Sequence, residues 1–244
     1  MRQGDAKGGR RSAKSAPSVR QRLIAAAERL FAERSWEAVS VRSIVAAANV
    51  NLAALNYHFG SKQSLLREIF AGRAEPIVQE RMQLLEEIRN RGGVPSLEEL
   101  LEAFLRPALG IEEHRGGSTF VKLRARLGAA PDAVSRKILR DTFDESSRCF
   151  LAEIERALPE ISPQDVAWRF HFMFGTMVYT MANVGRIESI TDGQCDTSNV
   201  ESAMRHLIPF LAAGFRCAPL KADKRTRPRG NSRKGPVKRR RTNR

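Results

Sequence analysis

Apolar residues recur at helical spacing along almost the whole chain between residues 18 and 217. Positions three and four apart lie on one face of a helix, so this pattern predicts helices that each bury one face. Strands would require alternation of apolar and polar residues with hairpin turn pairs between them, and the sequence shows neither. We therefore expect an all-α fold of about nine helices.

Two short helices separated by a tight turn are predicted early in the chain. Ser40 is placed to cap a helix whose apolar positions recur at helical spacing. Asn49 tolerates the left-handed backbone that a sharp turn needs, and Asn51 caps a second helix from about Leu52 to His58. This layout is that of a helix-turn-helix that inserts a helix into the DNA major groove. The apolar positions of the first helix are Val41, Ile44, Val45 and Ala48.

The second short helix carries groups suited to DNA. The small side chains of Ala53 and Ala54 allow a close approach to base edges, and an alanine methyl can meet a thymine methyl. Tyr57, His58 and Lys62 offer groups that hold phosphates and fix the register of the helix. The alternative is two ordinary core helices joined by a turn. The predicted DNA-binding set is Ser40, Arg42, Asn51, Leu52, Ala53, Ala54, Asn56, Tyr57, His58 and Lys62.

The remaining apolar pattern predicts a larger helical domain. A long helix begins near Ser61, and we expect Pro76 to kink or break it. A capping box, Ser96 with Glu99, precedes another helix, and Pro209 is expected to bend the last one. A Gly-rich link at 110–117 and Pro131 are interpreted as boundaries between elements. The later helices are predicted at 97–109, 118–127, 131–158, 163–185 and 199–217.

The net charge of +15 belongs to the ends of the chain. Residues 218–244 hold 12 Lys/Arg and one Asp, and residues 1–19 hold five Lys/Arg and one Asp, whereas 20–217 is neutral. Segments of this composition cannot bury a core, so both ends are predicted to be disordered. Either could add sequence-independent DNA contacts by counterion release, or act only as a solubilising extension. The expected domains are a basic arm 1–17, a helix-turn-helix domain 18–62, a ligand-binding and dimerisation domain 63–217 and a basic tail 218–244.

Several function classes find no support in the sequence. No run of eighteen apolar residues is present, and the start of the chain lacks a signal-peptide core, so we expect a cytoplasmic protein without a membrane partner. The three cysteines are far apart and form no C-x-x-C pair, which argues against a disulfide framework or a metal site. Four scattered histidines and no phosphate-binding glycine loop argue against an enzyme, and no cofactor is predicted.

The helix-turn-helix segment resembles the TetR family of transcriptional regulators. The shared features are an Ala-Ala-x-x-Leu-Phe core in the helix Arg20–Arg34, the Val41-Arg42-x-Ile44 helix and the turn before Asn51. Asn49, Asn51 and Asn56 depart from residues common in that family, and the departures at Asn51 and Asn56 leave the preferred DNA sequence open. The shared motif closes with Leu55-Asn56-Tyr57-His58-Phe59-x-Ser61-Lys62-x-x-Leu65-Leu66.

The second half resembles a TetR subgroup that senses long-chain fatty acids or their acyl-CoA esters. The likeness lies in the Asn51–Lys62 string, in Trp168-Arg169-Phe170-His171-Phe172-Met173 and in Leu207-Ile208-Pro209-Phe210-Leu211-Ala212-Ala213-Gly214. It implies that an acyl chain lies among Phe and Met side chains, with Arg124, Arg126 or Arg169 near the pocket mouth. For any single one of these apolar residues, a plain core position is the more common role. The predicted pocket is Phe104, Phe120, Leu123, Arg124, Leu127, Phe143, Phe150, Phe170, Met173, Phe174 and Met177.

A homodimer is the geometric expectation, because one short recognition helix reads only a few base pairs. TetR relatives pair their last two long helices as a four-helix bundle. The predicted interface is Trp168, Phe172, Met181, Leu207, Phe210, Leu211 and Gly214.

The leading hypothesis is a ligand-responsive regulator, released from a pseudo-palindromic double-stranded DNA operator by a small hydrophobic effector. The alternative within the family is a regulator of efflux or catabolism that senses another hydrophobic or aromatic compound. A sequence-indifferent architectural DNA protein is a further hypothesis, suggested by the basic ends.

Overall fold

The computed structural model describes residues 16–110, 117–130, 132–182, 186–196 and 199–218. Expectations for the basic arm before residue 16, the tail after 218, the link at 111–116 and Pro131 lie outside these ranges. Every regular element in the described part is an α-helix. The helices are α1 (Val19–Glu33), α2 (Val41–Ala48), α3 (Leu52–Phe59), α4 (Lys62–Asn90), α5 (Leu97–Leu109), α6 (Gly117–Ala129), α7 (Ala133–Ala157), α8 (Pro163–Ala182), α9 (Arg186–Ile190) and α10 (Val200–Arg216).

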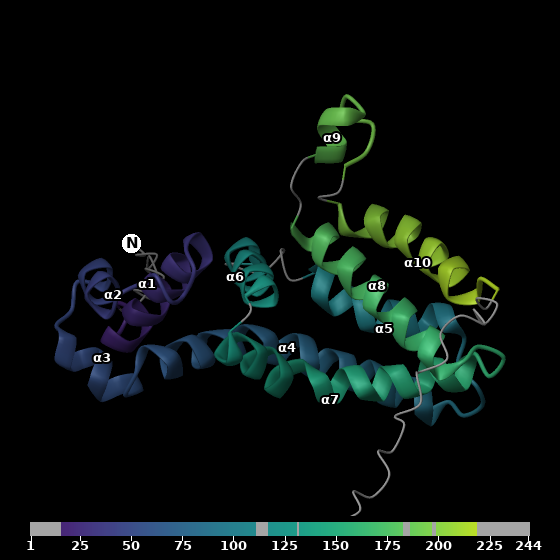
Figure 1. Ribbon diagram of the computed structural model, residues 1–244, viewed down its shortest axis with the longest axis horizontal. Helices are drawn as coiled ribbons and strands as arrows, with labels where there is room; N and C mark the ends of the chain where they lie inside the picture. Colours follow the sequence, from purple (N-terminus) through teal and green to yellow (C-terminus); the bar gives the residue numbers. More distant parts are fainter. Residues whose placement is uncertain (1–15, 111–116, 131, 183–185, 197–198, 219–244) are drawn as a thin grey trace, which may run out of the picture.

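The first three helices form a small unit at one end of the molecule (Figure 1). Ser18 and Gln21 make a reciprocal capping box at the start of α1, which satisfies two backbone donors. Asn49 ends α2 in the left-handed region with φ 51°, as the turn requires. Leu23, Ile44 and Leu55 are fully buried where α1, α2 and α3 meet. The predicted boundaries of this unit therefore follow from its caps and its apolar spacing.

Helix α4 runs without interruption from the unit formed by α1, α2 and α3 into the body (Figure 1). Pro76 lies inside the helix, so the predicted alternative of a break there is wrong, while the alternative of a kink stays a prediction. Pro76 and Gly72, the residue four positions before it, are both exposed, so the carbonyl that loses its backbone donor faces solvent. Packing against α1, α5 and α7 holds the helix on both sides of this position. Pro209 likewise lies within the continuous helix α10.

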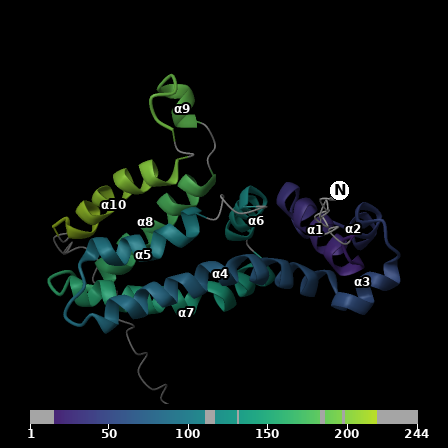
Figure 2. The same ribbon diagram turned by 180° about the vertical axis from the view of Figure 1, so that it is seen from behind.

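The body is a bundle of α5, α7, α8 and α10 beside the second half of α4 (Figures 1 and 2). Its centre is aromatic. The Phe104 ring packs against Phe150, Phe170 and Phe174 with ring centres 5.2–5.6 Å apart. These geometries are tilted or edge-to-face, which is favourable for aromatic pairs. The buried residues of the body and of the first three helices form one continuous hydrophobic cluster.

Helix α6 lies between the body and α1 in both ribbon views (Figures 1 and 2). Its Arg126 donates hydrogen bonds to the carbonyls of Ala32 and Glu33 in the last turn of α1, at 2.7 and 2.8 Å. Arg73 of α4 makes a bidentate ion pair with the buried Glu28 of α1, with both contacts at 2.8 Å. The first helix is therefore fastened to both neighbouring elements of the larger domain.

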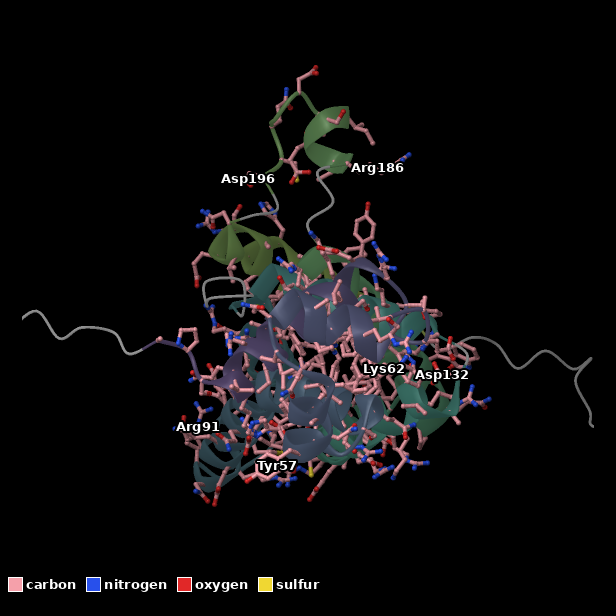
Figure 3. The ribbon with its side chains drawn as sticks, turned by 90° about the vertical axis from the view of Figure 1, so that its left-hand side faces the viewer. Tyr57, Lys62, Arg91, Asp132, Arg186 and Asp196 are labelled. Atoms are coloured by element: carbon pink, nitrogen blue, oxygen red, sulfur yellow. The ribbon has the colours of Figure 1, made fainter. Side chains whose placement is uncertain are left out.

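The short helix α9 stands away from the bundle, and Arg186 and Asp196 mark its segment in Figure 3. No helix in the described part of the chain combines the length and apolar character needed to cross a membrane.

Candidate DNA-binding site and effector pocket

The outward face of α3 is open to solvent, as the DNA-binding prediction requires. Tyr57 is 86% exposed and lies at the outer edge of this end of the molecule (Figure 3). Leu52, Ala53 and Asn56 are also exposed, while Ala54 and His58 are half-buried. The Tyr57 and His58 rings contact each other edge to face, with centres 5.1 Å apart. Small, polar and aromatic side chains, together with Leu52, are therefore available to a ligand on this helix.

The opposite face of α3 is anchored in the core. Leu55 and Phe59 are buried, and Asn51 caps the helix by accepting a hydrogen bond from the Ala54 amide at 2.9 Å. Ser40 caps α2 in the same way, through the Ser43 amide at 3.0 Å. The caps leave both side chains exposed beside Arg42, which is also exposed. Ser40 and Asn51 thus fix the two helices and remain within reach of a ligand on this face.

Lys62 does not contribute to this surface. Its ammonium group donates to the carbonyls of Trp36, Glu37 and Val39 at 2.8, 3.2 and 2.7 Å, and lies 5.0 Å from the Trp36 ring centre. Burial lowers the pKa of Lys62, against the opposing effect of the Glu37 charge. The prediction of a phosphate contact is therefore wrong, because all three donors serve the loop before α2.

A cavity of about 850 Å³ opens between α6, α7 and α8. Three residues of the predicted pocket line it: Arg124, Phe143 and Phe174. The other eight do not line the cavity, because they pack into the core: Phe104, Phe120, Leu123, Leu127, Phe150, Phe170, Met173 and Met177. Most of the lining was not predicted from the sequence, including Leu139, Asp144, Ser147, His171, Thr176 and Val178. A helical pattern separates buried from exposed positions but does not show where packing leaves a gap.

Of the three arginines considered for the pocket mouth, only Arg124 lines the cavity. It is 7% exposed, and burial lowers its pKa to about 10. Arg126 is directed to α1 instead, and Arg169 donates to the carbonyls of Phe215 and Cys217 at the end of α10. The expectation for Arg126 and Arg169 is therefore wrong.

A second buried arginine, Arg81 of α4, was not identified from the sequence. It is 0% exposed and donates from Nε to the Phe104 carbonyl at 2.7 Å. Burial, and secondarily the charge of Arg124, lower the pKa of Arg81 well below its usual range. A signal was present: Arg81 lies four residues after Ile77 and four before Leu85, at a core position of the helix.

An apolar face on α8 and α10 is exposed in the single chain. Trp168, Phe172 and Tyr179 on α8 are 56–61% exposed, and Phe210 on α10 is 68% exposed. Gly214 of the predicted interface lies on the same exposed side of α10 as Phe210. Three other members of that set, Met181, Leu207 and Leu211, are buried within the chain and are not part of this face. Helical spacing alone places them on a neighbouring stripe, which the body covers.

Within the described ranges, no three His, Cys, Asp or Glu side chains gather as a metal ion would require.

The fold and its sites define a DNA-binding transcription regulator that carries its own ligand-binding domain. Residues 23–69 match the tetR family of bacterial regulatory proteins, and residues 102–214 match the tetracyclin repressor-like C-terminal domain. Together the two matches cover more than half of the chain. The chain belongs to the TetR family, and it is a regulator rather than an enzyme.

Several solved structures share this fold. The TetR family regulator PfmR from Thermus thermophilus is 20% identical, with a TM-score of 0.56 over 85% of this chain and 100% of that chain. The fatty acid degradation regulator FadR from Bacillus halodurans is 17% identical, with a TM-score of 0.56 over 83% and 99%. FadR from Bacillus subtilis, in complex with stearoyl-CoA, is 16% identical, with a TM-score of 0.55 over 79% and 97%. Comparison with curated proteins gave no match.

The position of Lys62 generates a stability prediction. Lys62→Met removes the only side-chain donor seen on the carbonyls of Trp36, Glu37 and Val39 within the described part of the chain, so we expect a loss of roughly 1–3 kcal/mol in the free energy of unfolding. Chemical denaturation followed by circular dichroism measures it. Arg67→Met, at an exposed cation of the same helix, is the control and should change stability little. Equal stability of the two variants, with weaker DNA binding only in Lys62→Met, would restore the phosphate-contact assignment.

Proposed function

We propose that this chain is a repressor that binds a pseudo-palindromic operator as a homodimer in the cytoplasm. A small apolar effector binds in the cavity between α6, α7 and α8 and releases the dimer from DNA. The observation that carries this proposal is the position of α6: it lines the cavity through Arg124 and holds the end of α1 through Arg126. One helix thus joins the effector site to the DNA-binding unit.

The DNA contact is supported by the exposed face of α3. Its backbone is fixed by the Asn51 cap and by buried Leu55 and Phe59, so little conformational entropy remains to be lost on binding. The exposed Ala53 and Asn56 are placed for base edges, and Tyr57 for the phosphate backbone. The solvent exposure of these three side chains, and the hydrogen-bonding groups of Asn56 and Tyr57, support the proposed roles.

A second copy of the chain is the proposed occupant of the apolar face on α8 and α10. Four large aromatic side chains are exposed there, more than a soluble monomer usually presents on one patch. The exposed Gly175, Ala213 and Gly214 allow two such faces to approach closely. A two-fold contact of this kind also supplies the paired recognition helices that a palindrome needs.

Release by the effector would pass through α6. A ligand that enters beside Arg124 displaces side chains on α6, α7 and α8, and α6 is tied to α1 by two hydrogen bonds. Effector binding therefore favours a different placement of α1 and of the helices packed on it. A dimer with altered spacing between recognition helices binds the operator less tightly.

A long-chain fatty acid or acyl-CoA is the first effector class to examine. One structurally similar protein is named as a fatty acid degradation regulator, and another was solved in complex with stearoyl-CoA. The second candidate is another hydrophobic or aromatic compound, in a regulator of efflux or catabolism. The rings of Phe143, Phe172 and Phe174 along the cavity favour an aromatic ligand equally well.

The direct test uses the full-length protein purified without denaturation. Footprinting on the region upstream of its own gene should protect a pseudo-palindrome, and adding palmitate or palmitoyl-CoA should abolish that protection. Protection that neither compound affects would reject the fatty-acid effector, and an aromatic panel would then test the second candidate. Uniform, sequence-independent protection would reject the operator and favour an architectural DNA protein.

Two substitutions on α3 should have different effects. Tyr57→Ala should weaken binding to all DNA sequences by a similar factor, because a phosphate contact carries no sequence information. Asn56→Ala should relax discrimination at one position of each half-site, by about 1–3 kcal/mol. Gel shifts against the operator and single-base variants separate the two effects. Tyr57→Phe, which keeps the ring, is the matched control; sequence-selective loss in Tyr57→Ala would assign Tyr57 to base readout.

Dimerisation should depend on the aromatic face. Phe172→Glu and Phe210→Glu each place a charge in a patch that the second copy would bury, so both should shift the protein to monomer and lower operator affinity at least tenfold. Sedimentation velocity and gel shifts measure these changes. Val94→Glu replaces an equally exposed apolar residue outside the patch and should leave the dimer intact. A dimer that persists in both phenylalanine variants would move the interface elsewhere.

Coupling should depend on Arg126. Arg126→Gln weakens the link to Ala32 and Glu33 but leaves the cavity and α3 unchanged. Operator affinity and effector affinity should stay within about threefold of wild type, while the effector should release less DNA. Lys122→Gln, at an exposed position on the same helix, is the control. Normal release by Arg126→Gln would show that the signal takes another route.

A further inference from the structure

Two cations, one on α4 and one on α6, are buried without an acidic partner among the described residues. Arg81 is 0% exposed and Arg124 is 7% exposed. The other buried charged side chains are paired: Glu28 with Arg73, and Glu153 with Arg89 and Arg156. Because an unpaired buried charge is costly, the two arginines are an exception that needs a physical reason.

The contacts of Arg81 leave one guanidinium nitrogen unsatisfied. Its Nε donates to the Phe104 carbonyl, its Nη2 approaches the Met177 sulfur at 3.4 Å, and its Cζ lies 3.7 Å from the centre of the Phe104 ring. Nη1 is buried and has no hydrogen-bond partner in the described part of the chain. One neutral carbonyl, one ring and one thioether are weaker partners for a cation than a carboxylate.

Arg124 has a similar environment one helical turn away along α8. Its Nη1 approaches the Met181 sulfur at 3.4 Å, and its Cζ lies 4.7 Å from the centre of the Phe143 ring. Met177 and Met181 are separated by about 6 Å along the helix axis, so both guanidinium groups meet the same strip of α8. Asp144, the acid that lines the cavity, forms its ion pair with Arg148 at 3.0 Å. Neither arginine therefore receives negative charge from a neighbouring described side chain.

Arg124 is protonated when a ligand arrives. Burial lowers the pKa of Arg124 only to about 10, so it carries a full charge at pH 7. Two like charges in a region of low dielectric repel each other, and one added anion relieves that repulsion as well as the cost of burial. Arg124 is the one that lines the open cavity, and Arg81 lies behind it against Met177.

We propose that Arg124, backed by the charge of Arg81, binds the carboxylate of an amphipathic monocarboxylic acid that enters the cavity charged end first. The apolar part of the acid then lies along Phe143, Phe174 and Val178 toward the cavity mouth. This inference rests on the proposed function, because it names the chemical class of the effector for the same site.

The geometry favours a free acid over its coenzyme A ester. A guanidinium group donates two parallel hydrogen bonds to a carboxylate, whereas a thioester carbonyl is neutral and accepts singly. The polyanionic coenzyme A group is too polar to enter the apolar cavity, so an ester would have to enter by its methyl end. The methyl end would then be placed against Arg124, and the buried charge would stay unpaired.

Matched ligand pairs test the charge requirement. Isothermal titration calorimetry of the full-length protein would compare n-alkyl carboxylates of 8, 12 and 16 carbons with the alcohols of the same length, and 3-phenylpropionate with 3-phenylpropanol. In at least one pair, the carboxylate should bind about tenfold or more tightly than the alcohol, the effect of one charge-assisted hydrogen bond. Equal affinities in every pair, or no binding by any carboxylate, would overturn the proposal.

Arg124→Met tests the residue. The carboxylate preference should fall to about one, while the affinity for the alcohol should stay within about threefold of wild type. The melting temperature of this variant without ligand should equal or exceed that of wild type, because an unpaired buried charge has been removed. Arg148→Met, at an exposed arginine on α7, should keep the preference. A carboxylate preference that survives in Arg124→Met would overturn the assignment of Arg124. If Arg124→Met proves less stable than wild type, Arg124→Lys is used in its place and should keep part of the carboxylate preference. Complete loss of that preference in Arg124→Lys would also overturn the assignment.

Calorimetry uses no DNA, so this proposal and the proposed function fail separately. A carboxylate that binds through Arg124 but leaves the operator complex intact would support the charge-selective site and reject release by that ligand. Release of the operator by palmitoyl-CoA, with no carboxylate bound, would support the regulator and overturn the carboxylate site.

Discussion

Backbone carbonyls left without a donor constrain how this protein is assembled, and long cationic side chains from other elements satisfy them. The last turn of α1 accepts from Arg126 of α6, the loop before α2 accepts from Lys62 of α4, and the end of α10 accepts from Arg169 of α8. Helix ends always leave such carbonyls, and the ends of α1 and α10, together with the loop before α2, are used here as tertiary attachment points. The DNA-binding unit is therefore oriented by specific polar contacts as well as by apolar burial.

The sequence predicted most of the local structure, because local structure depends on residues a few positions apart. The caps at Ser40 and Asn51 and the left-handed Asn49 needed only chain-local chemistry. The prediction failed where a distant element decides the outcome. Pro76 stays within α4 because packing on both sides holds the helix, and Lys62 turns inward because three carbonyls of another segment lie within reach. Neither contact has a signature at fixed sequence spacing.

The proposed effector site shows the same contrast between features set by nearby residues and features set by distant elements, and shows it more strongly. Helical periodicity placed Phe104, Phe150 and Phe170 correctly in the interior, but it did not separate core from cavity lining. That separation depends on side-chain volumes from three helices together. The arginine at a core position of α4 was the more informative signal, since a charge at such a position is rarely neutral for stability. A search for charged residues on otherwise apolar helical faces would have found Arg81.

The continuity of α4 through Pro76 also sets a mechanical scale. Its 29 residues make a rod of about 44 Å, which begins beside α3 and ends in the body. A rotation of about 5° at the body end would move the other end by about 4 Å, close to the roughly 3.4 Å rise between neighbouring bases of one strand. A helix broken at Pro76 would absorb such a rotation at the break. An unbroken helix transmits the rotation along its whole length.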